Sequence, residues 1–236
     1  MTEVELKQTP YEDMLACSEG HLCAVIAIDE SGSMAGGKLQ AVIDGIERFK
    51  RANAADPLTL KRVDVCVLTF GGHGVRVLQD WTPMERFVKQ PPLELSAEGT
   101  TPMGEAILRS LELTRERNRL YLSLGTPAFT PFVMLITDGL PSDSLEEAKK
   151  RLRERENCRR VRLFCCGVGL EHTDMDTLAG ISKRVIQCTD EGALSHLFDW
   201  MTESIAIISH SRTVGEGDEA HLAPLPQGFT VVPSDW

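Results

Sequence analysis

The sequence predicts an α/β protein with a doubly wound, mostly parallel sheet, one antiparallel edge strand and helices on both faces. Short unbroken apolar runs, such as residues 24–28 and 132–136, are typical of strands buried on both faces of a parallel sheet. These runs alternate with segments of helical period, and that alternation indicates a doubly wound fold. Only a short glycine-rich turn, residues 71–74, separates two of the strands, which fits a hairpin and therefore an antiparallel edge strand.

The expected elements follow one another along the chain. The helix that starts at Lys38 has apolar residues on one side, while Lys38, Asp44, Glu47 and Lys50 are expected to face away from the core. Pro102 is suited to the start of the next helix because its ring holds the backbone angle φ near the helical value. Strands are expected over 24–28, 63–70, 75–81, 131–138, 161–168 and 184–188, and helices from 38 and from 103 onward and over 142–156, 173–181 and 190–210.

A chain of 236 residues fits one α/β domain. Residues 1–20 carry no regular pattern and are expected to form an N-terminal arm. Residues 21–210 would form the domain, and residues 211–236 a C-terminal tail rich in glycine, proline and acidic residues. The end of that tail, residues 229–236, has enough apolar residues to dock on the domain.

The charge and the cysteine content narrow the possible partners and locations. A net charge of −10 disfavours nucleic acids and anionic membranes as partners and is compatible with cation binding. The seven cysteines include no C-x-x-C pair, and the adjacent Cys165 and Cys166 are expected to point to opposite faces of a strand, so we interpret these thiols as buried and reduced. The polar N-terminus does not resemble a signal peptide, and no apolar run approaches the roughly 18 residues of a membrane span. We therefore expect a cytoplasmic protein.

Asp29, Ser31 and Ser33 directly follow the first apolar run, and Gly32 lets the backbone turn between the two serines. Ligands of open α/β sheets bind at the carboxyl ends of the strands. A carboxylate with two hydroxyls, and no His or Cys, suits a hard cation: Mg²⁺, Mn²⁺ or Ca²⁺. The alternative interpretation is an N-cap for the helix that follows.

A second strand also ends in an acid, Asp138, and the loop between the two strands carries Thr100 and Thr101. In a doubly wound sheet these two strands are neighbours at the switch point. We therefore expect Asp29, Ser31, Ser33, Asp138 and one loop threonine to lie around one point.

The motif Asp-x-Ser-x-Ser, the later Gly-Thr-Thr-Pro-Met-Gly loop and the final Thr-Asp-Gly occur in the order found in the metal-ion-dependent adhesion site of the von Willebrand factor type A (VWA) family. The sequence resembles this family over about residues 21–210. The resemblance implies that Ser31, Ser33 and a threonine touch the metal, and that Asp29 and Asp138 act mainly through water. Spacing favours Thr101, with Thr100 as the alternative. Glu30 departs from the small residue or threonine that is usual at its position.

Within the VWA family, the sequence is most similar to the tellurium-resistance, TerY-type branch. That resemblance implies a bacterial, cytoplasmic, non-enzymatic role in stress response, inside a multiprotein complex with kinase-like or phosphatase-like partners. A partner would contribute an acidic residue to the metal. The stretches that carry this similarity are residues 69–71, 99–106, 136–143, 166–169 and 207–211.

Two other readings remain open. A Mg²⁺-dependent phosphatase of the haloacid-dehalogenase type also places an Asp after its first strand, but it needs a second acid two residues later, where this chain has Ser31. A metal-free α/β scaffold would not respond to Mg²⁺ at all. The arginine- and glutamate-rich run 149–160 is interpreted as a solvated helix face, because acids interrupt its positive charges.

Overall fold

The computed structural model describes residues 19–170, 172–189, 191–211, 222–226 and 229–232, so the arm expected over residues 1–18 lies outside the described residues. Seven strands form one sheet in the order β3-β2-β1-β4-β5-β6-β7. The strands are β1 (Leu22–Glu30), β2 (Val63–Gly71), β3 (Gly74–Pro83), β4 (Phe132–Thr137), β5 (Arg162–Val168), β6 (Val185–Cys188) and β7 (Phe229–Val232). The helices are α2 (Gly37–Asn53), α3 (Pro57–Arg62), α4 (Met84–Phe87), α5 (Met103–Ser123), α6 (Glu146–Asn157), α7 (His172–Ala179) and α8 (Glu191–His210), with a short 3₁₀ helix, η1 (Gly32–Met34).

The predicted fold class is confirmed. Strands β2, β1, β4, β5 and β6 run parallel, and β3 returns antiparallel along β2 from the glycine-rich turn. The sequence did not indicate a second antiparallel strand: β7 pairs with β6 at the other edge, with Val185 opposite Val232. This strand lies within the segment assigned to the tail, and the boundaries proposed for arm, domain and tail remain a prediction. Helices α3 and α4 were also not anticipated, and α6 begins at Glu146 instead of near residue 142.

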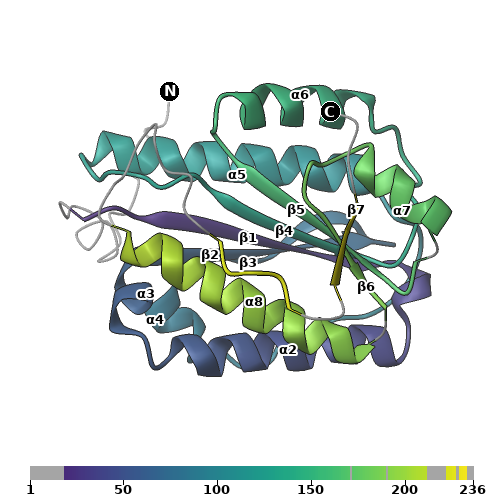
Figure 1. Cartoon of the computed structure of the whole chain (residues 1–236), viewed down its shortest axis with the longest axis horizontal. Helices are drawn as coiled ribbons and strands as arrows, with labels where there is room; N and C mark the ends of the chain where they lie inside the picture. The colour runs from purple at the N-terminus through teal and green to yellow at the C-terminus, as the bar shows by residue number, and fades with distance from the viewer. Residues whose placement is uncertain (1–18, 171, 190, 212–221, 227–228, 233–236) are drawn as a thin grey trace, which may run out of the picture.

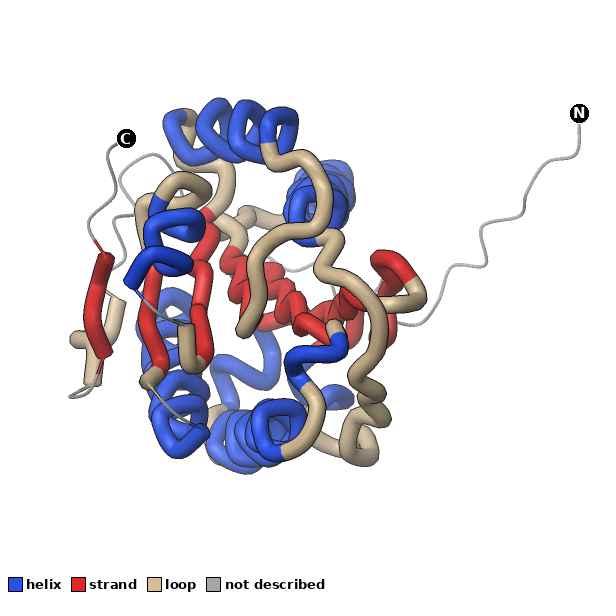
Figure 2. The backbone as a smooth tube through the Cα atoms, turned by 90° about the vertical axis from the view of Figure 1, so that its right-hand side faces the viewer, coloured by secondary structure: helices blue, strands red, loops and turns tan. Residues whose placement is uncertain are grey.

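The sheet is the middle layer of three (Figure 1). Helices α5, α6 and α7 cover one face, and α2, α3, α4 and α8 cover the other. Along β1 the side chains alternate between two cores: Ile26 packs with the α2 and α8 side, and Val25 with the α5 side. In Figure 2 the carboxyl ends of the parallel strands face the viewer, and loops lie in front of the strands.

Five of the described cysteines are buried and take part in hydrophobic packing. As predicted, Cys165 and Cys166 point into opposite cores. Burial raises the pKa of the Cys165 and Cys166 thiols above their usual range. The described cysteines form no disulfide, and they are Cys23, Cys66, Cys158, Cys165, Cys166 and Cys188, of which only Cys158 is exposed.

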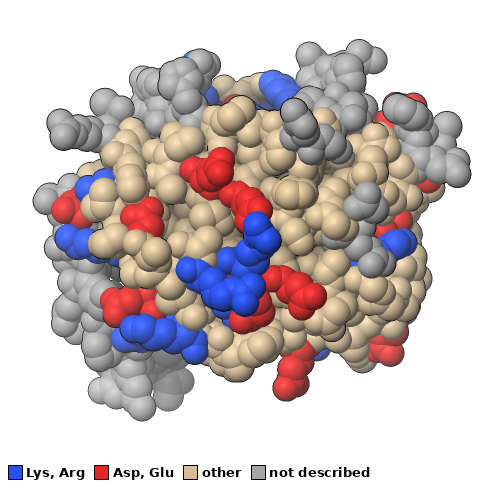
Figure 3. Space-filling view, turned by 60° about the horizontal axis from the view of Figure 1, so that its bottom comes forward, with Lys and Arg blue, Asp and Glu red and all other residues tan. Residues whose placement is uncertain are grey.

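The face that carries α2 and α8 shows positive and negative side chains side by side (Figure 3). One pair joins the two helices: Arg48 donates to both carboxylate oxygens of Asp199, at 2.5 and 2.7 Å. Lys50 corrects an expectation, because its side chain is 2% exposed instead of facing solvent. Its ammonium donates to Glu47 at 2.7 Å and to the carbonyl of Pro91 at 2.9 Å, since the loop after α4 folds over it.

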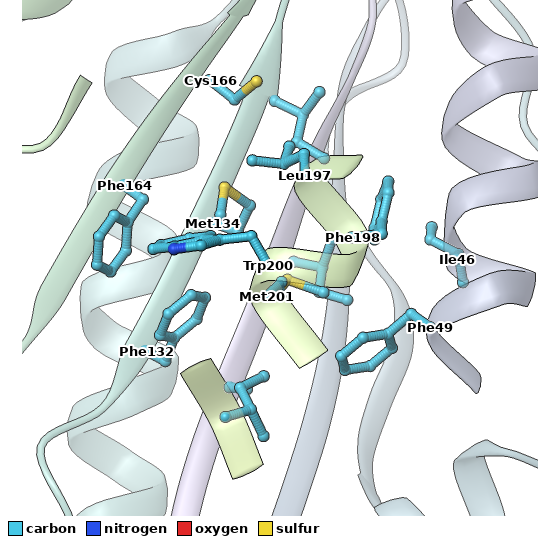
Figure 4. Close-up of a cluster of buried hydrophobic side chains, with 14 of the residues drawn as sticks. Ile46, Phe49, Phe132, Met134, Phe164, Cys166, Leu197, Phe198, Trp200 and Met201 are labelled. Atoms are coloured by element: carbon cyan, nitrogen blue, oxygen red, sulfur yellow. The ribbon is translucent and has the colours of Figure 1, made fainter. Parts of the chain in front are cut away.

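Helix α8 is held between the sheet and α2 by aromatic packing (Figure 4). The Trp200 ring lies edge-on to Phe164, with ring centroids 5.1 Å apart, and Phe164 stacks on Phe132 at 4.9 Å. On its other side, Phe198 packs so closely on Gly45 of α2 that a methyl group there would lie 2.1 Å from the ring. Trp200 also donates its indole N–H to the carbonyl of Ala223 at 2.8 Å, which fastens residues 222–226 along the helix.

Among the described helices, none combines the length and apolar character that a membrane span needs.

Candidate metal centre

Asp29 lies near the end of β1, at the point in the sheet where the strand order reverses between β1 and β4. Strand β1 pairs with β4 in parallel register up to Ile28 and Ile136, so Asp29 and Thr137 are neighbours across the two strands. The Thr137 hydroxyl donates to Asp29 Oδ2 at 2.6 Å, and the Ser31 backbone N–H donates to Asp29 Oδ1 at 2.7 Å. The Asp29 carboxylate is fully buried and its direction is fixed by both neighbours.

The two serines connect Asp29 to the second acid. Ser31 and Ser33 lie at the start of and within η1, and their hydroxyl oxygens are 3.0 Å apart. Ser33 then donates to Asp138 Oδ1 at 2.6 Å. The helix-cap alternative does not describe these residues, because Ser31 makes no side-chain capping bond and the residue before α2 is Gly36.

Thr101 completes the arrangement, and Thr100 does not. A methyl group at Gly139 would lie 3.3 Å from Thr101 Oγ1, 3.5 Å from Ser33 Oγ and 3.9 Å from Asp29 Oδ2, so these three oxygens surround one small space. Thr101 is 6% exposed, whereas Thr100 lies on the surface. The structure therefore brings Asp29, Ser31, Ser33, Thr101 and Asp138 together at the carboxyl edge of β1 and β4.

The loop before Thr101 is bound to the β1 and β2 ends. Glu30 does not face the site: its carboxylate accepts from Arg76 at 2.9 Å and from the Ser96 N–H at 3.1 Å. The Glu98 N–H donates to the Glu30 carbonyl at 2.8 Å. Gly99 has φ +73° and approaches Gly72 so closely that a side chain on Gly99 would meet the Gly72 Cα at 2.2 Å. Glu30 differs from the residue types usual at its position in the family, and its contacts anchor the loop that carries Thr101.

A second set of contacts holds Thr101 from the other side. Its backbone N–H donates to the Ser142 hydroxyl at 3.0 Å, and its carbonyl accepts from the Ser142 N–H at 2.9 Å. Asp143 then accepts from the N–H groups of Gly104 and Glu105, at 2.9 and 2.8 Å, and so caps α5 from a different loop. The sequence reasoning missed this cap because the cap and the helix are about 40 residues apart.

Lys38 is another residue that sequence reasoning did not place in the site. Its ammonium lies 2.5 Å from Asp138 Oδ2, although the residue was expected only to face away from the core. The side chain is 34% exposed, while that of Asp138 is fully buried. Its place in the first turn of α2, five residues after Ser33, is the one sequence signal that could have indicated it.

Electrostatics at this edge favour a positive charge. Burial raises the pKa of the Asp29 carboxyl, and the charge of Asp138 acts in the same direction, against hydrogen bonds from Thr137 and Ser31. A cation would lower the cost of burying this charge. The oxygen donors are two carboxylates and three hydroxyls, a set that fits Mg²⁺, Mn²⁺ or Ca²⁺. The described residues contain no group of three or more His, Cys, Asp and Glu side chains placed to hold a metal ion.

The candidate oxygens do not line the cavity of about 340 Å³ found beside α5 and α6, whose walls include Arg109, Arg115, Arg151 and Arg155. They lie instead at the loop edge of the sheet, where Ser33 is exposed.

Fold and site together define an α/β domain that groups oxygen-bearing side chains at the switch point of its sheet. The family model of the von Willebrand factor type A domain matches residues 25–200. The chain belongs to this family, whose domains are protein-interaction modules. A comparison with curated protein sequences found no match.

Solved structures share the fold at low sequence identity. The vWF domain of the pilus tip protein Mfa5 from Porphyromonas gingivalis superposes with a TM-score of 0.63 at 11% identity, covering 84% of this chain and 99% of that one. The pilus adhesin SpaC from Lactobacillus rhamnosus GG has a TM-score of 0.62 at 12% identity over 81% of this chain, which spans only 31% of SpaC. Proximal thread matrix protein 1 from the mussel byssus, solved with zinc in its MIDAS motif, has a TM-score of 0.55 at 16% identity, covering 79% of this chain and 46% of that one.

The cap on α5 is testable by substitution. Asp143→Ala should lower the free energy of unfolding by about 1–2 kcal/mol, because two helix N–H groups lose their acceptor. Ser144→Ala is the control, since Ser144 accepts one N–H at 3.5 Å, the limit of a hydrogen bond. Denaturant unfolding would measure the free energy of unfolding of both variants. Equal losses would show that Asp143 contributes no more to stability than Ser144 does.

Proposed function

We propose that this chain is a non-enzymatic VWA module that holds a divalent cation and uses it to bind another protein. The ligands would be Asp29, Ser31, Ser33, Thr101 and Asp138, with Mg²⁺ as the first candidate and Mn²⁺ or Ca²⁺ as alternatives. The supporting observation is that oxygens of Asp29 and Ser33, at and just after the end of β1, and of Thr101, from a separate loop, surround the space next to Gly139.

The ligand types favour binding over catalysis. A coordination shell rich in neutral hydroxyls neutralises little of the charge of Mg²⁺, which prefers six oxygens. The ion would keep its attraction for a further anionic oxygen, which an acidic residue of a partner could supply. Leu140, two residues after Asp138, is 49% exposed. It would offer an apolar contact beside the acidic residue of the partner. A haloacid-dehalogenase-type phosphatase is the weaker candidate, because Ser31 occupies the position of its second acid.

The narrower assignment rests on sequence motifs. The resemblance to the TerY-type branch of tellurium-resistance proteins supports a bacterial, cytoplasmic component of a stress-response complex. The expected partners are kinase-like or phosphatase-like proteins.

Thermal unfolding in EDTA and in Mg²⁺ tests the metal site. A cation at a hundred times its dissociation constant should stabilise the wild type by about 2.7 kcal/mol, which corresponds to roughly 5–11 °C for a domain of this size. Asp29→Asn should abolish this rise. In EDTA the variant should be no less stable than wild type, because it no longer buries a charge and Thr137 can donate to Gly139 O instead. An equal Mg²⁺ response in both proteins would refute the assignment of Asp29.

The choice between the two threonines is a separate prediction. Thr101→Ala should weaken Mg²⁺ binding about tenfold or more, because one of the five proposed ligand side chains loses its oxygen. Thr100→Ala should leave the affinity unchanged within about twofold, since its side chain faces solvent. Isothermal titration with Mg²⁺ measures both affinities. If Thr100→Ala weakens binding more than Thr101→Ala does, the ligand is Thr100.

Affinity capture with the full chain as bait tests partner binding. A specific partner should be retained in Mg²⁺ and lost in EDTA, and the Asp29→Asn bait should fail to retain it in either buffer. Retention of the same partner by the variant would show that the interface does not use the metal.

A further inference from the structure

Both carboxylate oxygens of Asp138 are already engaged by groups of this chain. Oδ1 accepts from the Ser33 hydroxyl at 2.6 Å, and Oδ2 lies 2.5 Å from the Lys38 ammonium. The Asp138 side chain is fully buried. A buried carboxylate without a counter-charge is costly, and the Lys38 ammonium supplies that counter-charge.

We propose that Lys38 is an internal cation that neutralises Asp138 in the metal-free domain and competes with the divalent ion for that carboxylate. The proposal rests on the metal site described under Proposed function and adds the residue that sets its affinity. The ammonium and a divalent ion seek the same negative charge, and like charges at such short range repel one another. Binding of the ion therefore requires Lys38 to move away from Asp138.

The surroundings of Lys38 allow this movement. Besides Asp138, its ammonium has one weak contact within the described part of the chain, with the Ser33 carbonyl at 3.5 Å. The side chain is 34% exposed and starts in the first turn of α2, directly after Gly36 and Gly37. A lysine stem of four carbons can swing the ammonium into water from there without breaking any other contact.

Lys50, twelve residues further along α2, is by contrast a lysine that several contacts hold in place. Its side chain is 2% exposed, and the ammonium donates to Glu47 and to two carbonyls at 2.7–3.3 Å, above the Phe87 ring. Removing that ammonium would leave several acceptors unsatisfied inside the protein. Lys38 has one strong partner and an open path to solvent, which suits an exchangeable cation.

Competition predicts opposite effects on the two states. Without metal, Lys38→Gln removes the charge partner of Asp138, so the melting temperature in EDTA should fall by about 2–4 °C. With metal, the same change removes the competitor, so Mg²⁺ should bind about tenfold tighter, the size expected when a partly buried ion pair no longer has to be broken.

Isothermal titration with Mg²⁺, together with thermal unfolding, would test this on the full chain. Lys38→Arg keeps the positive charge and should bind Mg²⁺ within about threefold of wild type. Lys89→Gln is the matched control, since it breaks an exposed lysine–glutamate pair of 3.2 Å far from the site and should leave the Mg²⁺ affinity unchanged. Lys38→Met, which keeps the aliphatic stem, repeats the test if the glutamine variant folds poorly.

The outcomes separate this proposal from the one it rests on. If wild type binds Mg²⁺ and Asp29→Asn does not, but Lys38→Gln binds no tighter than wild type, then the role of Lys38 is refuted and the metal site stands. If Lys38→Gln binds and wild type does not, the competition is supported in its strongest form. If wild type, Lys38→Gln and Lys38→Met all fail to bind, both proposals are refuted.

Discussion

The burial of the Asp29 carboxylate at the end of β1 is the constraint on which the candidate site depends. A charge placed between two parallel strands must be satisfied within the protein, and Thr137 of β4 and the Ser31 backbone supply the hydrogen bonds. The bond from Thr137 joins the ends of the two strands at the switch point. From there, hydroxyl-to-hydroxyl and hydroxyl-to-carboxylate contacts extend through Ser33 to Asp138. One buried charge thus orders two loops that are more than 100 residues apart in sequence.

The third loop is ordered by contacts that do not involve the side chains of the candidate ligands. Glu30 binds Arg76 and the Ser96 N–H on one side, and Ser142 binds the Thr101 backbone on the other. Because these anchors are backbone and ion-pair contacts of the domain itself, they position Thr101 without help from the proposed cation or partner. Preorganisation of this kind lowers the cost of binding.

The packing beneath the site explains why the loops have a rigid base. Alternating residues of β1 enter two separate cores, and α8 is fixed on one of them by Trp200 against Phe164 and by Phe198 against Gly45. The C-terminal end of α8 is also held, since His210 lies 2.8 Å from an Asp56 oxygen and Arg62 donates to the Ser209 carbonyl at 2.8 Å. The sheet and this helix therefore form one packed support for the loop edge.

The sequence by itself determined the α/β class, the order of most strands and helices, and the local spacing of Asp29, Ser31 and Ser33. Those features depend on hydrophobic period and on neighbours within a few residues, which a sequence displays directly. Only the tertiary structure decided that Thr101 is buried and Thr100 exposed, that Lys38 reaches Asp138, that Asp143 caps α5, and that residues 229–232 add β7 to the sheet. Each of these depends on which loop, helix or strand lies next to another across many residues of chain, and local periodicity carries no information about that.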